Sequence, residues 1–160
     1  MPPITLQAID AKQTELDAKQ TELSKLIAQF KDQATRPVVY SLQKAEFTLQ
    51  PGEHYAGPVL DEAGNVLHHL VLMAQKPTAK LNWSAAMAWA DGVGGTLPNR
   101  QEMSLLFANC KPHLQPVWHW SCEVHENDAS YAWGCGFGNG GIDIIRKSYE
   151  GRCVAVRRFL

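Results

Sequence analysis

The sequence has no long hydrophobic run, no excess of one charge and no metal-binding arrangement of its cysteines and histidines. No segment approaches the roughly 20 apolar residues that a membrane-spanning helix requires. The first residues also lack the basic and apolar segments of a secretion signal. With a formal net charge of −1, nothing favours binding to nucleic acid. We therefore expect a soluble chain that inserts in no membrane and leaves its cell only within an assembled particle.

The four cysteines, Cys110, Cys122, Cys135 and Cys153, include no CxxC pair. Cys122 and His125 have the spacing of half a zinc site, but no second half follows. We therefore expect neither a metal nor a cofactor. Free buried thiols are usual in a protein that folds in a reducing cytosol, and a Cys135–Cys153 disulfide remains an open alternative.

What the sequence does contain is a tandem repeat of seven residues, DAKQTEL, at 10–16 and again at 17–23. A strict seven-residue period keeps one stripe of a helix facing a partner helix. In this register the contact positions are Leu6, Ile9, Gln13, Leu16, Gln20, Leu23, Ile27 and Phe30. The stripe is apolar at both ends and has two glutamine layers in its middle.

This stripe predicts a parallel coiled coil over residues 1–35 that joins the chain into a homotrimer, with a dimer as the alternative. Lys12 of one helix is expected to pair with Asp17 of its neighbour, which fixes register more than it adds stability. Polar contact layers lower stability but select among oligomeric states. The competing interpretation is a single amphipathic helix folded back on its own domain.

The rest of the sequence predicts a neck over residues 36–48 and one compact domain over residues 49–160. Two apolar runs separated by the turn-forming residues 61–65 predict a β-hairpin within residues 55–73. Because its second strand is apolar on both faces, we expect that strand to lie in the middle of a sheet.

Two helices are expected next. The first begins at Asn82 or Ser84 and ends at the glycine cluster that starts with Gly92. The second begins at Asn99, where Glu102 has the spacing of a capping box. The sequence beyond it is rich in tryptophan and glycine and has β character, so the expected fold class is α+β with antiparallel sheets.

Glycine recurs at every second position from Gly134 to Gly140. In an extended strand this period would place all four glycines on one face and leave that face as bare backbone. Such a face can pack closely against another backbone. It can also form a shallow floor for a ligand or a partner loop, and the sequence leaves both alternatives open.

From residue 49 onward, several segments occur in a recognisable order: LQPGEHYAG, HHLVLM, LNWSAAMAWADGVGGTLPNRQE, WHWS, YAWGCGFGNGG and KSYEGRCVAVRRF. This order resembles the domain of unknown function shared by the C-terminal region of a bacterial collagen-like adhesin and many small phage and prophage proteins. The resemblance implies a C-type-lectin-like fold, related to that of the formylglycine-generating enzyme. The same fold group includes phage receptor-binding proteins and the variable proteins of diversity-generating retroelements.

In this fold class, loops before and within the last sheet bind the ligand, which implies residues 125–131 and 134–146 here. The implied ligand-binding residues are His125, Glu126, Asn127, Asp128, Tyr131, Asn139, Asp143 and Arg146. The calcium-binding pattern of calcium-dependent lectins is missing. The family also implies that the last strand pairs with the first.

Large side chains near the C-terminus are interpreted as part of the scaffold. Core positions are expected for Trp118, Trp120 and Trp133. Of Arg157 and Arg158, one is expected in a buried pair or a cage of backbone carbonyls and the other in solvent. Ile144 and Ile145 are either core residues or an apolar contact patch, and the sequence does not separate these alternatives.

Together these features predict a non-enzymatic receptor-binding protein of a phage tail fibre or baseplate. The expected partners are other virion proteins and a host surface receptor, which would be a pilus, a polysaccharide or a protein. One alternative is a structural or assembly protein of the particle with no host ligand. Another is an enzyme of the formylglycine-generating type, which would require Cys135 and Cys153 as a reactive pair.

Overall fold

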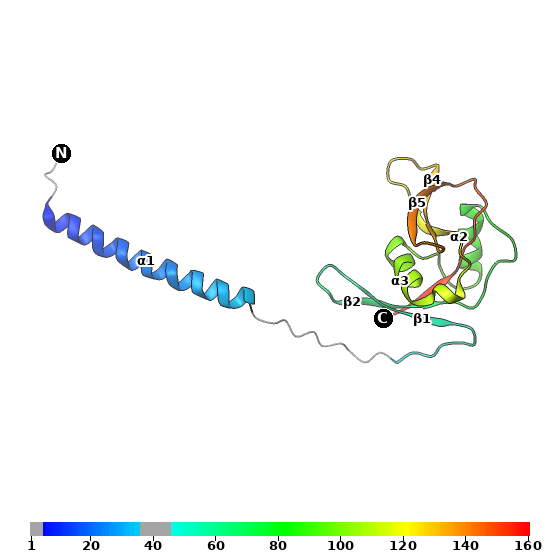
Figure 1. Cartoon of the computed structure of the whole chain (residues 1–160), viewed down its shortest axis with the longest axis horizontal. Helices are drawn as coiled ribbons and strands as arrows, with labels where there is room; N and C mark the ends of the chain where they lie inside the picture. The colour runs from blue at the N-terminus through cyan, green and yellow to red at the C-terminus, as the bar shows by residue number, and fades with distance from the viewer. Residues whose placement is uncertain (1–4, 36–45) are drawn as a thin grey trace. The chain divides into compact units, whose positions relative to one another are not determined.

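The computed structural model describes residues 5–35 and 46–160, which belong to two separate units (Figure 1). The first unit contains one helix, α1 (Leu6–Thr35), and the second is an α+β head. The neck predicted over residues 36–48 lies mostly outside the described residues. Within the described ranges, no helix combines the length and the hydropathy that crossing a membrane requires.

Helix α1 has 30 residues and is therefore about 45 Å long. Its apolar stripe is not buried: 58% of Leu16 and 56% of Leu23 is exposed. Two ion pairs lie within α1, because both Lys12 and Lys19 contact Glu15, at 2.7 and 2.8 Å. The pair between Lys12 and a neighbouring helix stays a prediction.

The first sheet of the head is antiparallel, with the order β1 (His54–Leu60), β2 (Val66–Leu72) and β6 (Val156–Phe159). The predicted hairpin and the central position of its second strand are confirmed. The implied pairing of the last strand with the first is wrong, because β6 pairs with β2. Leu70, Val71 and Leu72 are all buried, which agrees with the position of β2 between two neighbouring strands.

The two ends of the head nevertheless lie close together. The ring of Phe47 stacks on that of Phe159 with centroids 5.0 Å apart. The Arg157 guanidinium donates to the Thr48 carbonyl at 3.2 Å and pairs with Glu53. Side chains thus connect the start of the head to its last strand, although the backbone pairing differs from the expectation.

Both predicted helices form, and both begin as the sequence indicates. The Asn82 side chain caps α2 (Trp83–Gly92) by accepting from the Ala85 N–H at 3.0 Å. The capping box formed by Asn99 and Glu102 starts α3 (Arg100–Cys110), and a short 3₁₀ helix, η1 (Lys111–His113), follows. These are local interactions, and local sequence therefore predicts them.

The second sheet is also antiparallel, with the order β3 (Trp118–Val124), β4 (Tyr131–Gly136) and β5 (Gly141–Arg146). The glycine run does not remain extended to Gly140, because β4 ends at Gly136 and residues 137–140 form the turn into β5. Gly140 has φ +80° in that turn, a conformation that favours glycine. Only Gly134 and Gly136 share one face of β4.

Gly134 supports the close-packing alternative. A Cβ atom at this position would lie 2.9 Å from the His119 carbonyl oxygen and 2.6 Å from the Ile145 Cδ1 atom. The isoleucine side chain can rotate away, but the backbone carbonyl of a paired strand cannot.

We therefore expect Gly134→Ala to lower the free energy of unfolding by about 1–3 kcal/mol, the usual cost of overpacking. Chemical denaturation of the full chain measures this. Gly92→Ala is the matched control, because no atom lies within 4 Å of a Cβ built at that helical position. Equal stability of the two variants would contradict the packing argument.

The tryptophans do not all lie in the core. Trp120 is fully buried and donates its indole N–H to the Leu81 carbonyl at 2.8 Å. Trp133 is half-buried beneath the guanidinium of Arg100, which lies 4.4 Å from its ring centroid. Trp118 is 36% exposed. The core prediction is therefore correct for Trp120 and wrong for Trp118.

The two C-terminal arginines are both paired, so the expectation that one points freely to solvent is wrong. They alternate along β6 and reach opposite sides of the sheet. Arg157 pairs with Glu53, and the Nε atom of Arg158 donates to the buried Glu102 carboxylate at 2.6 Å. On each side of the sheet, one carboxylate therefore forms an ion pair with one guanidinium.

Candidate functional site

Side chains of the predicted ligand loop, residues 125–131, contact other residues of the head. Glu126 accepts hydrogen bonds from Arg100 at 2.9 Å and from the Trp133 indole at 3.3 Å. The His125 ring lies 5.6 Å from the Trp133 ring. A backbone hydrogen bond and these contacts outweigh desolvation and lower the pKa of Glu126. The loop is thus anchored to the start of α3.

The other predicted polar residues of this loop, Asp128 and Asn127, differ in whether their side chains form hydrogen bonds. Asp128 accepts from the N–H and the hydroxyl of Ser130 at 2.9 and 2.6 Å, and these bonds lower the pKa of its carboxyl group. Asn127 is exposed and has no polar partner within residues 5–35 and 46–160. Three or more histidine, cysteine or acidic side chains do not gather into a metal site anywhere in these ranges.

Two more predicted site residues pair across the edge of the second sheet. Tyr131 on β4 lies opposite Arg146 on β5. Arg146 donates to the tyrosine hydroxyl at 3.2 Å, and its guanidinium carbon lies 5.4 Å from the ring centroid. This contact uses one of the guanidinium N–H groups of Arg146 and an acceptor position of the Tyr131 hydroxyl.

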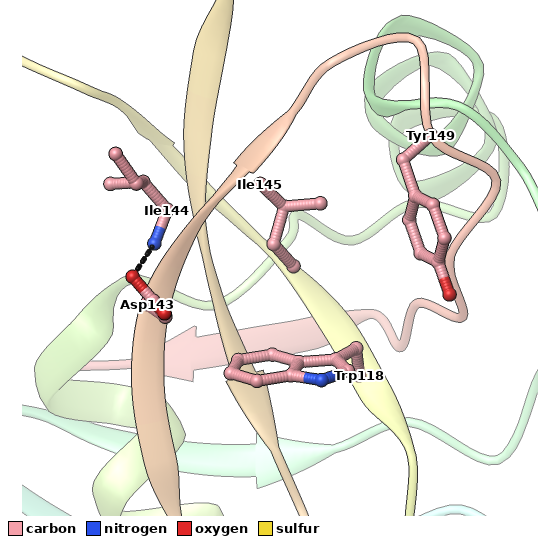
Figure 2. A pocket seen from close by; sticks show the side chains of 5 residues that line it. All are labelled: Trp118, Asp143, Ile144, Ile145 and Tyr149. Atoms are coloured by element: carbon pink, nitrogen blue, oxygen red, sulfur yellow. Dashed lines mark hydrogen bonds between the residues drawn. The ribbon is translucent and has the colours of Figure 1, made fainter.

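Asp143 is one of two predicted ligand residues that line a pocket, and Asn139 is the other. Asp143 lines a shallow hollow of about 300 Å³ together with Trp118, Ile144, Ile145 and Tyr149 (Figure 2). The two isoleucines point to opposite sides of β5 in Figure 2. Ile145 packs against the core, whereas Ile144 is 36% exposed. The core alternative therefore holds for Ile145, and the contact-patch alternative stays a prediction for Ile144.

Trp118 lies over the glycine face of β4. It pairs with Gly136 across the strands, and a Cβ atom on that glycine would lie 3.6 Å from the indole Cε2 atom. The indole therefore lies on the same face of the sheet as Gly136, with room for a methyl group between the ring and the glycine backbone. A second hollow of about 270 Å³ also includes Trp118 and is lined by Pro116, Val117, Gly136, Gly138 and Asn139. Trp118 thus lines both hollows.

Several polar groups around Trp118 retain hydrogen-bonding capacity. The indole N–H groups of Trp83, Trp120 and Trp133 all donate to the protein. Within the described residues, the Trp118 indole and the Tyr149 hydroxyl have no such partner. Asn139 and Asp143 each use one side-chain oxygen to accept from a nearby backbone N–H, at 3.1 and 2.8 Å. The Asn139 amide nitrogen and the second Asp143 oxygen stay available.

The sequence analysis missed Trp118 and Tyr149. Trp118 was interpreted as core because its large side chain could fill a core between irregular β loops. Tyr149 lies between the polar residues Ser148 and Glu150 in a turn, a setting typical of an exposed aromatic side chain. That signal was present in the sequence.

The cysteines give no support to thiol chemistry. All four are free, so the open alternative of a Cys135–Cys153 disulfide is not realised. Burial raises the pKa of the Cys135 thiol and raises that of Cys153 to about 11. Because the thiolate is the reactive form, both residues are nearly inert at neutral pH.

Comparison with known proteins adds no relative. No protein-family model matches the sequence, and a search of curated proteins finds no match.

Proposed function

We propose that this chain is a receptor-binding adhesion protein of the phage tail-fibre type, located in the tail or baseplate of a virion. In this proposal α1 forms a parallel homotrimeric coiled coil. Each chain carries a C-type-lectin-like head that binds a ligand on the host cell surface. The observation that carries the proposal is the unburied heptad stripe of α1, in a chain whose head has an open aromatic pocket.

The stripe argues for partner helices. Isolated helices gain little stability from propensity alone, and α1 leaves Ile9, Leu16, Leu23 and Ile27 between 46% and 58% exposed. Burial of these side chains in a shared seam would supply the missing stability. The two glutamine layers favour one oligomeric state over others, and we assign that state as the trimer.

Clustering explains why such a helix is joined to the head. The hollows beside Trp118 are shallow and offer few polar groups, so a single head is suited to weak binding. Three heads on one stalk convert the second and third contacts into intramolecular events with a high effective concentration. Avidity then replaces the need for a deep pocket.

The secondary structure of the head supports the lectin-like assignment. It has two main helices and two small antiparallel sheets, as its sequence motifs imply. One of its predicted ligand residues, Asp143, lies at the open pocket.

Binding of the labelled full chain to intact bacteria tests the proposal. We expect saturable binding to the host strain. Asp143→Ala should weaken it about tenfold or more, as expected for losing a hydrogen bond to a charged group at each head. Asp91→Ala, which changes an exposed aspartate on α2, is the control and should bind normally. Saturable binding to no strain, with the protein located inside purified particles, would instead favour the internal structural role.

A further inference from the structure

The residues that line the two hollows beside Trp118 indicate the class of ligand that binds there. We propose that they bind a neutral saccharide chain, with one sugar unit in each hollow on either side of the indole. This inference rests on the proposed function and names the ligand class of that same site.

The central feature is an exposed aromatic ring on a paired strand. Trp118 lies opposite Gly136 in the second sheet and is 36% exposed. One side of a pyranose ring presents several C–H groups, which pack favourably on the face of an aromatic ring. Because Trp118 belongs to a strand that is paired in the sheet, binding a sugar does not need to order its backbone first.

The polar groups match the hydroxyl rim of a sugar. A hydroxyl group can both donate and accept. In the larger hollow, a sugar unit can donate to Asp143 and exchange a hydrogen bond with the Tyr149 hydroxyl. In the other hollow, the Asn139 amide nitrogen can donate to a second unit. The unpartnered indole N–H of Trp118 is a further donor between them.

The charge of the site indicates a neutral ligand. Asp143 is the sole charged residue among those that line the two hollows. The cations that follow Asp143 on the chain, Arg146 and Lys147, do not line either hollow, and they contact the aromatic residues Tyr131 and Trp83. A carboxylate that is the sole charge lining the hollows disfavours uronic, sialic or sulfated sugars. A carboxylate accepting from neutral hydroxyl groups is favourable.

The size of the site fits a short segment of a chain. Hollows of about 300 and 270 Å³ are at or below the lower end of the range for small-molecule sites. Neither encloses a large ligand, but two side by side suit consecutive small units of a linear polymer. The trimer would then bind three such segments on one surface polymer.

Fluorine NMR of the full chain containing 5-fluorotryptophan tests the inference directly. Its five tryptophan signals are assigned by single replacements. The probes are cellotriose, maltotriose, mannotriose and the trimer of N-acetylglucosamine. We expect at least one to shift the Trp118 signal at concentrations on the order of millimolar, while the signal of buried Trp120 stays in place.

Trp118→Ala should reduce saccharide binding at least tenfold, measured by saturation-transfer NMR on the sugar. Trp118→Phe, which keeps an aromatic ring, should retain part of it and guards against misfolding of the alanine variant. Val124→Ala is the matched control, since Val124 is 38% exposed at the other end of β3. This control should bind normally.

Two results would overturn the inference. One is that none of the four trisaccharides shifts Trp118 at about 20 mM, a concentration well above the range of useful affinities. The other is preferential binding of the anionic probe trigalacturonate.

Two further results distinguish a failure of the saccharide site from a failure of the proposed function. If cells bind the wild type and Trp118→Ala equally well, the saccharide site is wrong but adhesion stands. If a trisaccharide binds at Trp118 while no cells bind, the site stands and adhesion is wrong.

Discussion

Glu102→Gln is expected to lower the free energy of unfolding by about 3–5 kcal/mol, the usual cost of breaking a buried ion pair. The Glu102 carboxylate is fully buried. It accepts from Arg158 Nε and Nη2 at 2.6 and 2.8 Å and from the Asn99 N–H at 2.8 Å. It also lies 2.8 Å from His68 Nε2. One side chain therefore connects β2, α3 and β6.

The same residue should make the head sensitive to acid. Burial alone would raise the pKa of Glu102, but the hydrogen bonds from Arg158 and Asn99 outweigh it and hold the pKa below its ordinary value of 4.5. A lowered pKa means that its contribution to stability is complete above pH 4.5 and is lost as the pH falls through the folded-state value. Denaturation curves below pH 5 should therefore show a flatter pH dependence for Glu102→Gln than for the wild type.

Glu126→Gln is the matched control, because its partner Arg100 and Glu126 itself are both substantially exposed. An exposed pair contributes about 0–1 kcal/mol, so this variant should unfold almost as the wild type does. If Glu102→Gln were within 1 kcal/mol of the wild type, with an unchanged acid limb, Glu102 would not connect the elements of the head as described.

The second large effect concerns helix α1. Replacing both Leu16 and Leu23 with Glu should dissociate the trimer and weaken binding to cells by about 100- to 10,000-fold, the range over which avidity acts. Each substitution places three like charges at one layer of the predicted seam. The head should keep its stability and its affinity for any monovalent ligand.

Ala11→Glu with Ala18→Glu provides the control. These positions carry the same added charge in the same two repeats, but they lie on the side of the helix away from the predicted seam. We expect this variant to remain trimeric and to bind cells as the wild type does. Analytical ultracentrifugation reports the oligomeric state, and flow cytometry reports the binding. Equal behaviour of the two double variants would show that the stripe has no special role.

The elements that sequence predicted well are those set by short-range chemistry. The hairpin within residues 55–73 follows from its turn, in which the Asp61 carboxylate accepts from the N–H groups of Ala63 and Asn65. The helix starts at Asn82 and Asn99 follow from side chains that cap neighbouring N–H groups. Each signal lies within four residues of the structure that it determines.

What the sequence did not predict depends on contacts between distant residues. Glu102 was interpreted as a local capping residue, yet it also pairs with Arg158, 56 positions away. The pairing of β6 with β2 depends on which strand can be buried on both faces. The surroundings of Trp118 depend on its pairing with Gly136 across the second sheet, 18 positions away. Period and propensity carry no information about such partners.

The predicted ligand residues lie in different settings for the same reason. Asp143 does line a pocket, and Asn139 lines the neighbouring one. Glu126 and Arg146 are instead used by Arg100 and Tyr131. A polar loop in the sequence shows that side chains are exposed or satisfied, but only the folded chain distinguishes these two states.

The most direct test is the mass of the native full-length protein in solution, measured by native mass spectrometry at micromolar concentration. The account predicts a single species of three chains, each of 17.8 kDa, with α1 helical by circular dichroism. A monomer whose first thirty residues are not helical would contradict it.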